Sequence, residues 1–368
     1  MVITFLQLNY VPSPWRTKLD RVDWIGSAIS VSSLTSLLIP LTWGGVMYSW
    51  SSWHTVVPLA IGCCGLVGFV FYERYGAREP LLRLQIFRTR TAAVSYFGTV
   101  LHGLILWCGL YYLPLYFEGV RGFSPITSGV AILPVTFTVA PAATLVGIII
   151  TMTGSYRWII WIGWVLGTLG LGLFYLMDVH TSNVSWIFIM VVAGLGLGAL
   201  FPSLAFAVQG SSADSDLGFA IAMFSFFRAF GQTVGIAVGG VVFQNRIRAA
   251  LQTYPQLAPY ADTYSKDAAA LVEILKTMND GMDKENIKQA YADSLKTVWA
   301  VCCAAAGLGL ISSLWTKHYD LNRALVTEQG FMHSGKSQRE LQDTFISSEE
   351  LADTNKACSG SGLSSQMQ

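Results

Sequence analysis

One charged residue, Arg228, interrupts an otherwise uncharged and largely apolar run, Leu217–Asn245. The run has 29 residues, which is more than the roughly 20 that an α-helix needs to cross the hydrocarbon of a bilayer. An arginine near the middle of such a helix costs about 2.5–3.5 kcal/mol on insertion scales and is tolerated where it faces protein or a water-filled cavity. Two interpretations of Arg228 are open: a helix-packing residue satisfied by backbone carbonyls, or a residue on a translocation path.

The residues around Arg228 sort onto two faces when the run is placed on a helix at about 100° per residue. Small residues spaced by four let helices approach closely, whereas a bulky apolar stripe suits lipid. We therefore expect Gly231, Gly235 and Gly239 to be helix-packing residues and Arg228 to point toward partner helices. The small and polar face carries Ser225, Arg228, Gly231, Gln232, Gly235 and Gly239, and the bulky face carries Phe219, Met223, Phe226, Phe230, Ala237 and Val241.

A second group of chemically versatile side chains lies in the run Thr91–Phe117. His102 could exchange a proton near neutral pH, or it could simply be hydrogen-bonded inside the membrane. The aromatic residues Trp107, Tyr111 and Tyr112 could line a pocket for apolar ligands, or they could serve packing alone. Together with Arg228 and Gln232, these four residues are the candidate substrate-binding residues.

Enzymatic chemistry has no visible counterpart in the sequence. We find no nucleophile–base constellation, no metal-binding spacing of His, Cys, Asp or Glu and no phosphate-binding loop, so we predict no catalytic residue, no metal and no cofactor. Gly194, Gly196 and Gly198 superficially resemble a nucleotide-binding motif, but that motif requires a preceding strand and a following helix. Because these glycines lie inside an apolar run, close helix packing or a flexible helix is the better interpretation.

Composition places the chain in a membrane. Of its 368 residues, 53% are hydrophobic and 12% are charged, and soluble domains carry about twice that charged fraction. The net charge is +1 and no basic face emerges, which argues against a nucleic-acid partner because such binding depends on clustered Lys and Arg.

Eight uncharged, helix-length runs predict an all-α membrane protein with eight transmembrane helices. Tryptophan and tyrosine gather at their edges, as expected at membrane–water interfaces. The longest runs include loop residues, so their helices should be shorter than the runs. The eight runs are Trp24–Thr42, Trp53–Tyr72, Thr91–Phe117, Gly122–Tyr156, Trp158–Met177, Val179–Ala213, Leu217–Asn245 and Thr297–Thr316.

The runs divide the chain into five segments. Residues 1–23 form a cytoplasmic lead-in that resembles the end of a preceding helix, 24–72 a helix pair, and 73–90 a basic loop. Residues 91–316 form a six-helix bundle with an external loop at 246–296, and 317–368 form a disordered cytoplasmic tail. The short loop 73–90 holds five arginines, and the positive-inside rule therefore assigns it to the cytoplasm.

Five stretches resemble, in the same order, fungal fourteen-span drug:proton antiporters of the major facilitator superfamily, such as mycotoxin and multidrug efflux pumps. They are LDRVDWIG (19–26), PLLRLQIFRTRT (80–91), YYLPLYFEGVRGFSPITSGVAILP (111–134), GLGLGALFPSLAFAVQ (194–209) and FFRAFGQTVGIAVGGVVFQN (226–245). The resemblance implies two linker helices followed by the carboxyl-terminal six-helix bundle of such a pump, without its first six-helix bundle. It also implies a remnant of a gating loop at Gly147, Gly154 and Arg157, in which Thr151, Met152 and Ser155 replace the family's charges.

The function that this resemblance implies is proton-coupled efflux of small organic molecules, such as drugs, toxins or secondary metabolites, at the plasma membrane. Its partners would be the lipid bilayer, the organic substrate, protons and the missing bundle. One bundle cannot form both walls of a passage between two repeats, so the chain is either an N-terminally truncated product or a half-transporter that pairs with another bundle. Two alternatives stay open: a non-transporting membrane fragment or partner subunit, and a nutrient or siderophore importer of the same superfamily.

Overall fold

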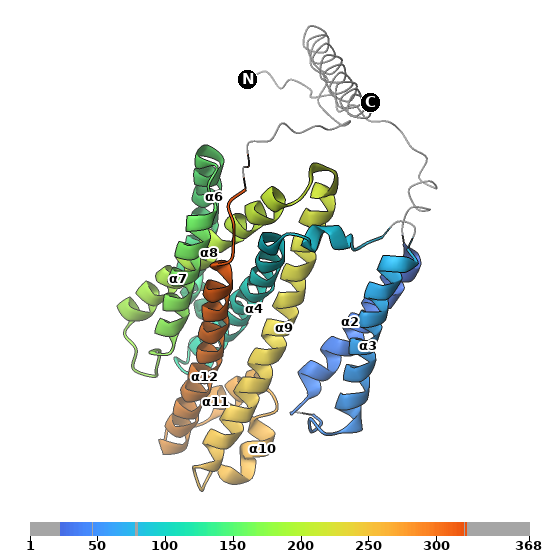
Figure 1. Ribbon diagram of the computed structural model, residues 1–368. Coiled ribbons are helices and arrows are strands. Elements are labelled where there is room, and N and C mark those ends of the chain that lie inside the picture. Colours follow the sequence, from blue (N-terminus) through green and yellow to red (C-terminus); the bar gives the residue numbers. More distant parts are fainter. Residues whose placement is uncertain (1–22, 46, 78–79, 320, 322–368) are drawn as a thin grey trace, which may run out of the picture. The chain divides into compact units, whose positions relative to one another are not determined.

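The computed structural model describes residues 23–45, 47–77, 80–319 and 321. Residues 1–22 of the predicted lead-in (1–23) and most of the predicted tail (317–368) lie outside these residues. Within the described part of the chain, the regular elements are helices, and no strand forms (Figure 1).

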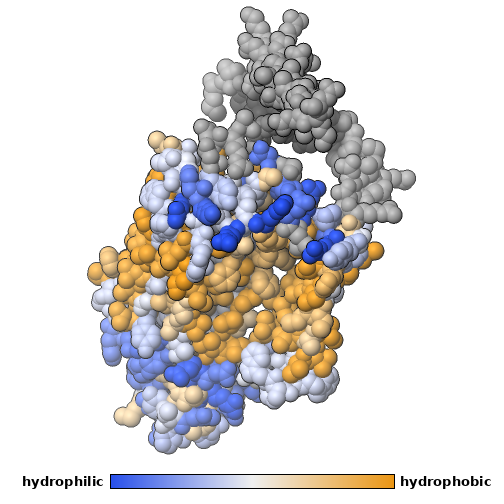
Figure 2. Space-filling view, viewed as in Figure 1, coloured by the Kyte–Doolittle hydropathy of each residue, from blue (hydrophilic) through white to orange (hydrophobic). Residues whose placement is uncertain are grey.

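Eight helices or helix pairs in the described residues are long and apolar enough to cross a membrane, which confirms the predicted all-α fold and number of spans. Figure 2 shows a broad apolar band between two polar ends, as expected of a protein whose middle is surrounded by lipid and whose two ends lie in water. The spans are α2 (Trp24–Trp43), α3 (Trp53–Tyr75), α4 (Arg90–Gly119), α5 with α6 (Pro125–Ala131 and Leu133–Thr153), α7 (Arg157–Phe174), α8 (Asn183–Ser211), α9 (Leu217–Gln252) and α12 (Met282–Ser313).

Shorter helices occupy the connections between spans. A 3₁₀ turn, η1 (Leu84–Phe87), precedes α4, and another, η2 (Asp214–Asp216), precedes α9. The connection between α9 and α12 holds η3 (Ala258–Tyr260), α10 (Ala261–Tyr264) and α11 (Ala268–Thr277).

The helices on either side of this connection extend beyond the predicted spans. Helix α9 continues to Gln252 and α12 begins at Met282, so the segment predicted as loop 246–296 is helical at both ends. The spans are predicted from uncharged runs, which end at the first charged residue. The backbone hydrogen bonds of a helix continue through charged residues. The first turns of α12 are supported by an ion pair one turn apart, Lys288–Glu285 at 2.8 Å.

Helices α2 and α3 form an antiparallel pair that is closed by polar contacts at one end. Asp23 caps α2 by accepting a hydrogen bond from the Gly26 N–H at 2.8 Å and another from the Tyr72 hydroxyl at 3.2 Å. Toward the other end, Gly62 lies against the backbone of Leu37, where a Cβ would collide with it. The linker pair is therefore packed backbone to backbone, which small residues permit.

Helix α4 is the centre of the six-helix bundle and packs against α8, α9 and α12. It is also the most buried of the eight spans. The fourth span is broken at Ile132, between α5 and α6. Pro134 explains the break, because proline lacks an N–H and its ring clashes with the carbonyl one turn earlier.

The basic loop and the short connection before α9 lie at the same end of the bundle. Arg83 forms an ion pair with Asp216 at 2.8 Å, and its guanidinium lies over the Phe219 ring with Cζ 4.0 Å from the centroid. This contact agrees with the alternating direction of eight successive spans, because the two connections are separated by an even number of crossings.

The first residues after α12 contact this same end of the bundle. The disorder predicted for 317–368 stays a prediction. The Lys317 N–H donates to Thr91 Oγ1 at 2.9 Å. The Tyr156 hydroxyl donates to the Lys317 carbonyl at 3.0 Å and accepts from the Tyr319 N–H at 3.1 Å. These hydrogen bonds hold the backbone of Lys317 and Tyr319 against the bundle.

Candidate functional site

A cavity of about 390 Å³ lies between α8 and α9. It contains two of the six candidate substrate-binding residues, Arg228 and Gln232, one turn apart on α9. Its volume falls within the range of small-molecule sites. The lining residues are Phe201, Ala205, Val208 and Gln209 of α8, with Ile221, Phe224, Ser225, Arg228, Ala229 and Gln232 of α9.

The guanidinium of Arg228 lies against an aromatic ring rather than a carboxylate. Its Cζ is 4.3 Å from the centroid of the Phe201 ring, and its buried Nε has no hydrogen-bond partner among the described residues. A cation–π contact contributes about 0.5–2 kcal/mol, whereas leaving a buried donor unpaired costs about 1–3 kcal/mol or more. The positive charge at this wall of the cavity is therefore only partly compensated.

The glycine stripe of α9 brings α4 and α9 into close contact. A Cβ at Gly231 or Gly235 would collide with the carbonyl oxygens of Val100 and Leu104, respectively, on α4. Gly239 faces the ring of Tyr112 in the same way. These three glycines thus lie directly against α4, and Arg228 lies toward α8, where its side chain reaches Phe201.

The four remaining candidates do not line this cavity. His102 is buried, and its Nε2 is 2.9 Å from the Leu197 carbonyl of α8. Tyr112 is buried and donates to the Ile236 carbonyl at 3.4 Å. Trp107 and Tyr111 are 41% and 48% exposed on α4. The structure therefore gathers Arg228 and Gln232 at one place and leaves the others in helix contacts or on an exposed stripe.

Part of the bulky face of α9, which suited lipid by its sequence, lines a cavity within the protein. Phe219, Met223 and Phe226 line a second cavity of about 390 Å³, which Phe69 of α3 and the Pro80–Leu82 segment close from the other side. Farther along the helix, Ala237, assigned to the same face, is only 5% exposed. Helical periodicity separates two faces, but it does not distinguish lipid from an apolar surface of the same protein.

The residues of the predicted gating-loop remnant lie around the α6–α7 turn. Gly154 ends α6 with a φ of 65°, a left-handed conformation that favours glycine. Arg157 begins α7, with its Cζ 4.6 Å from the ring centroid of Trp161 and its buried Nε unpartnered among the described residues. Gly147 has open space where a Cβ would stand. None of the ion pairs among the described residues involves these three positions.

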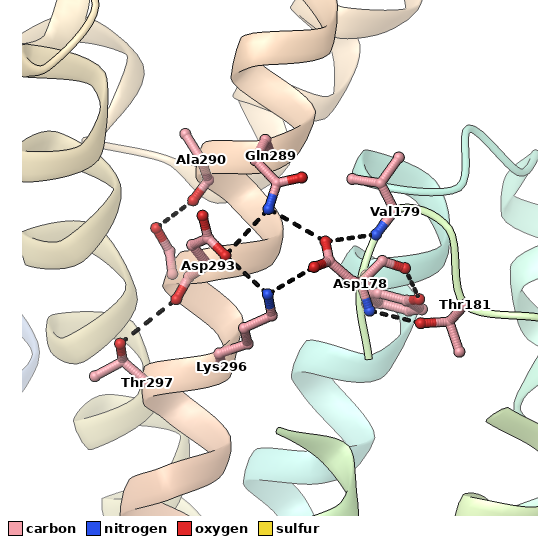
Figure 3. A network of polar contacts seen from close by, with 10 residues as sticks. Asp178, Val179, Thr181, Gln289, Ala290, Asp293, Lys296 and Thr297 are labelled. Atoms are coloured by element: carbon pink, nitrogen blue, oxygen red, sulfur yellow. Dashed lines mark hydrogen bonds and ion pairs between the residues drawn. The ribbon is translucent and has the colours of Figure 1, made fainter. Parts of the chain in front are cut away.

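A polar network that sequence reasoning did not find joins the α7–α8 connection to α12 (Figure 3). Asp178 accepts hydrogen bonds from Lys296 at 2.8 Å, from the Val179 N–H at 2.7 Å and from Gln289 at 3.2 Å. Partial burial of Asp178 opposes its ionisation, but these three donors outweigh that effect and lower its pKa below the ordinary value. From the sequence alone, Asp178 reads only as an interfacial acid, because its two side-chain partners, Lys296 and Gln289, lie more than a hundred residues away.

The described residues contain no group of three or more His, Cys, Asp or Glu side chains that could hold a metal ion. The cavity at Arg228 offers instead a cation, two amides, a hydroxyl and apolar walls. Such a lining can bind and orient a small molecule.

Comparison with known proteins gives a consistent picture. Residues 11–241 match the profile of the Major Facilitator Superfamily. The chain is 49% identical to the MFS transporter L2 of a Phoma species over 336 residues, which cover 91% of this chain and 56% of that protein. It is 35% identical to the efflux pump FUS6 of Gibberella fujikuroi, with 89% and 60% covered. It is also 35% identical to the Acurin A biosynthesis cluster MFS-type transporter of Aspergillus aculeatus, with 85% and 57% covered.

The relatives are longer than this chain. It spans between 56% and 61% of the length of the curated relatives it matches. What their names say about transport is therefore a property of a longer polypeptide.

Proposed function

The chain belongs to the major facilitator superfamily, and from this premise we propose that it forms part of a transporter that exports small organic molecules. It is a multi-pass membrane protein, with eight spans in its described residues. The observation that carries the proposal is the cavity between α8 and α9, where Arg228 and Gln232 face an apolar wall inside a membrane protein. Intramembrane ionisable residues commonly mark substrate pathways.

A passage that opens alternately to two sides requires two walls. We propose that a second six-helix bundle supplies the other wall. The exposed aromatic residues Trp107 and Tyr111 support this arrangement, because large side chains that are nearly half exposed on the central helix of a bundle suit an interface or a pathway. The resemblance to drug:proton antiporters further supports a proton gradient as the driving force and the plasma membrane as the location.

A chimera tests the proposal. The segment of the Phoma transporter that matches this chain is replaced by the chain itself, and the chimera is produced in yeast cells that lack their own efflux pumps. We expect cells with the chimera to accumulate less of a fluorescent organic compound than cells with empty vector, and a protonophore to abolish the difference.

The matched control is the same chimera with Arg228→Ala, compared at equal amounts in the membrane. If the chimera is present at the cell surface and accumulation equals that of the empty vector for a panel of neutral, acidic and basic compounds, the proposal is wrong. If export is intact with Arg228→Ala, the cavity is not part of the pathway.

A further inference from the structure

The charge in the lining of the α8–α9 cavity is positive. Among the described residues, the lining includes one cation, Arg228, and no acidic residue. The other polar groups of the lining are the amides Gln209 and Gln232 and the hydroxyl of Ser225, and its remaining residues are apolar. The nearest acid along the chain, Asp216, is already paired with Arg83.

The charge and contacts of Arg228 determine which kind of ligand suits this cavity. Its guanidinium contacts the Phe201 ring, and its buried Nε lacks an acceptor among the described residues. A cationic ligand would be repelled, and a neutral apolar ligand would leave the Nε–H unpaired. An ionised acid would supply the missing acceptor, and a guanidinium presents its N–H groups in a fork that matches a carboxylate. Charge-assisted hydrogen bonds of this kind are about twice as strong as neutral ones.

We infer that this cavity binds organic anions, so that the transported molecules include small amphipathic acids. Their carboxylate lies at Arg228, and their apolar body lies against Phe201, Phe224 and Ile221. This inference rests on the proposed function and narrows its substrate class. A cavity of about 390 Å³ accommodates a molecule of one or two fused rings with a short acidic side chain.

A pair of probes that differ only in charge tests the inference. The full chain is reconstituted in nanodiscs of zwitterionic lipid, so that no lipid anion competes, and its affinities for 1-naphthaleneacetate and for the neutral 1-naphthaleneacetamide are measured at pH 7. We expect the acid to bind roughly 10- to 100-fold more tightly than the amide, the range that a charge-assisted hydrogen bond supplies.

Substitutions then test whether Arg228 is responsible for the tighter binding of the acid. Arg228→Gln should reduce the binding of the acid to the level of the amide and leave the amide unchanged. Arg228→Lys should retain part of the preference, because it keeps the charge and loses the fork. The matched control is Arg246→Gln, which removes an exposed arginine from the same helix about 27 Å farther along its axis and should change neither affinity.

Equal affinities for the two probes, weaker binding of the acid, or no binding of either would overturn the inference. So would a preference for the acid that persists in Arg228→Gln. If Arg228→Gln does not fold, the wild-type comparison and Arg228→Lys still decide the outcome. Failure of the inference differs from failure of the proposed function, because the chimera would then still export neutral compounds.

Discussion

At the scale of single residues, two charged side chains have opposite surroundings. Asp178 lies at a helix connection and is held by three hydrogen-bond donors, one of them Lys296. Arg228 lies in the middle of a span and has an aromatic ring for a neighbour. A charge that is fully partnered stabilises an arrangement of helices, whereas a charge that is not fully partnered remains available to a ligand.

Asp178→Asn tests the structural role of the first charge. The substitution removes the ion pair with Lys296, and we expect a loss of about 1 kcal/mol in stability, because Asp178 is partly exposed and its ion pair is screened by solvent. Thermal unfolding of the detergent-solubilised protein measures the effect. Asp280→Asn is the matched control, since Asp280 pairs with Lys284 while 95% exposed and should matter little.

The contribution of Asp178 to stability should depend on pH. The pKa of Asp178 is lowered in the folded protein, so its contribution to stability is fully present above the ordinary pKa of an aspartate, about 3.9. That contribution is lost as the pH falls through the lower folded value. We expect the difference in melting temperature between wild type and Asp178→Asn to be constant from pH 5 to 8 and to shrink toward pH 3. A difference that grows on acidification would contradict the assignment.

At the scale of elements, the contact between α4 and α9 depends on glycine. Gly231 and Gly235 lie against carbonyl oxygens of α4, so the two backbones meet without side chains between them. This contact sets the position of α9 and therefore of Arg228. On the opposite, bulky face, residues of α9 line a cavity together with Phe69 of α3 and residues of the basic loop. Helix α9 is thus fixed against α4 by its glycines, and its polar residues Arg228 and Gln232 line the cavity with α8.

Gly231→Ala tests this close approach. The new Cβ would collide with backbone atoms of Val100, which cannot move aside as a side chain could. The two helices must therefore separate, and we expect a destabilisation of about 1–3 kcal/mol, as overpacked cores show. Gly68→Ala is the control, because its Cβ would meet open space and a helical Gly→Ala change is otherwise neutral or stabilising. Equal melting temperatures for both variants would show that α4 and α9 are not in close contact.

At the scale of the whole molecule, eight alternating spans place the chain's connections on two sides of a membrane. The Arg83–Asp216 ion pair joins two connections at the same end, and the segment after α12 contacts Thr91 and Tyr156 at that end as well. The connection that contains α10 and α11 belongs to the other end, after an odd number of crossings. The positive-inside rule predicts that the arginine-rich end faces the cytoplasm.

Labelling from outside the cell tests this orientation. Single cysteines at Gln85 and Asp280 are introduced into a variant that lacks the six native cysteines, and intact cells are treated with a membrane-impermeant maleimide. We expect Asp280→Cys to be labelled and Gln85→Cys to react only after the cells are permeabilised. Labelling of both positions in intact cells would exclude the eight-span layout, and the reverse pattern would invert it.

The sequence by itself determined the class of fold, because every span must satisfy its backbone hydrogen bonds inside a bilayer and therefore leaves a long uncharged run. It also determined which face of α9 is small and polar, since a helical period follows directly from residue order. The sequence did not predict helix ends such as Gln252 and Met282, because a helix can continue through charged residues beyond the hydrocarbon.

Only the tertiary structure decided which partner covers each face. One cavity is lined by Phe226 and Leu81, and one ion pair joins Asp178 to Lys296. The residues of each pair are far apart along the chain and come together only when the helices pack. The same holds for the cavity, which requires Phe201 of α8 opposite Arg228 of α9. Local patterns depend on neighbours three or four residues apart, whereas a binding site depends on how separate helices are arranged, and packing settles that arrangement.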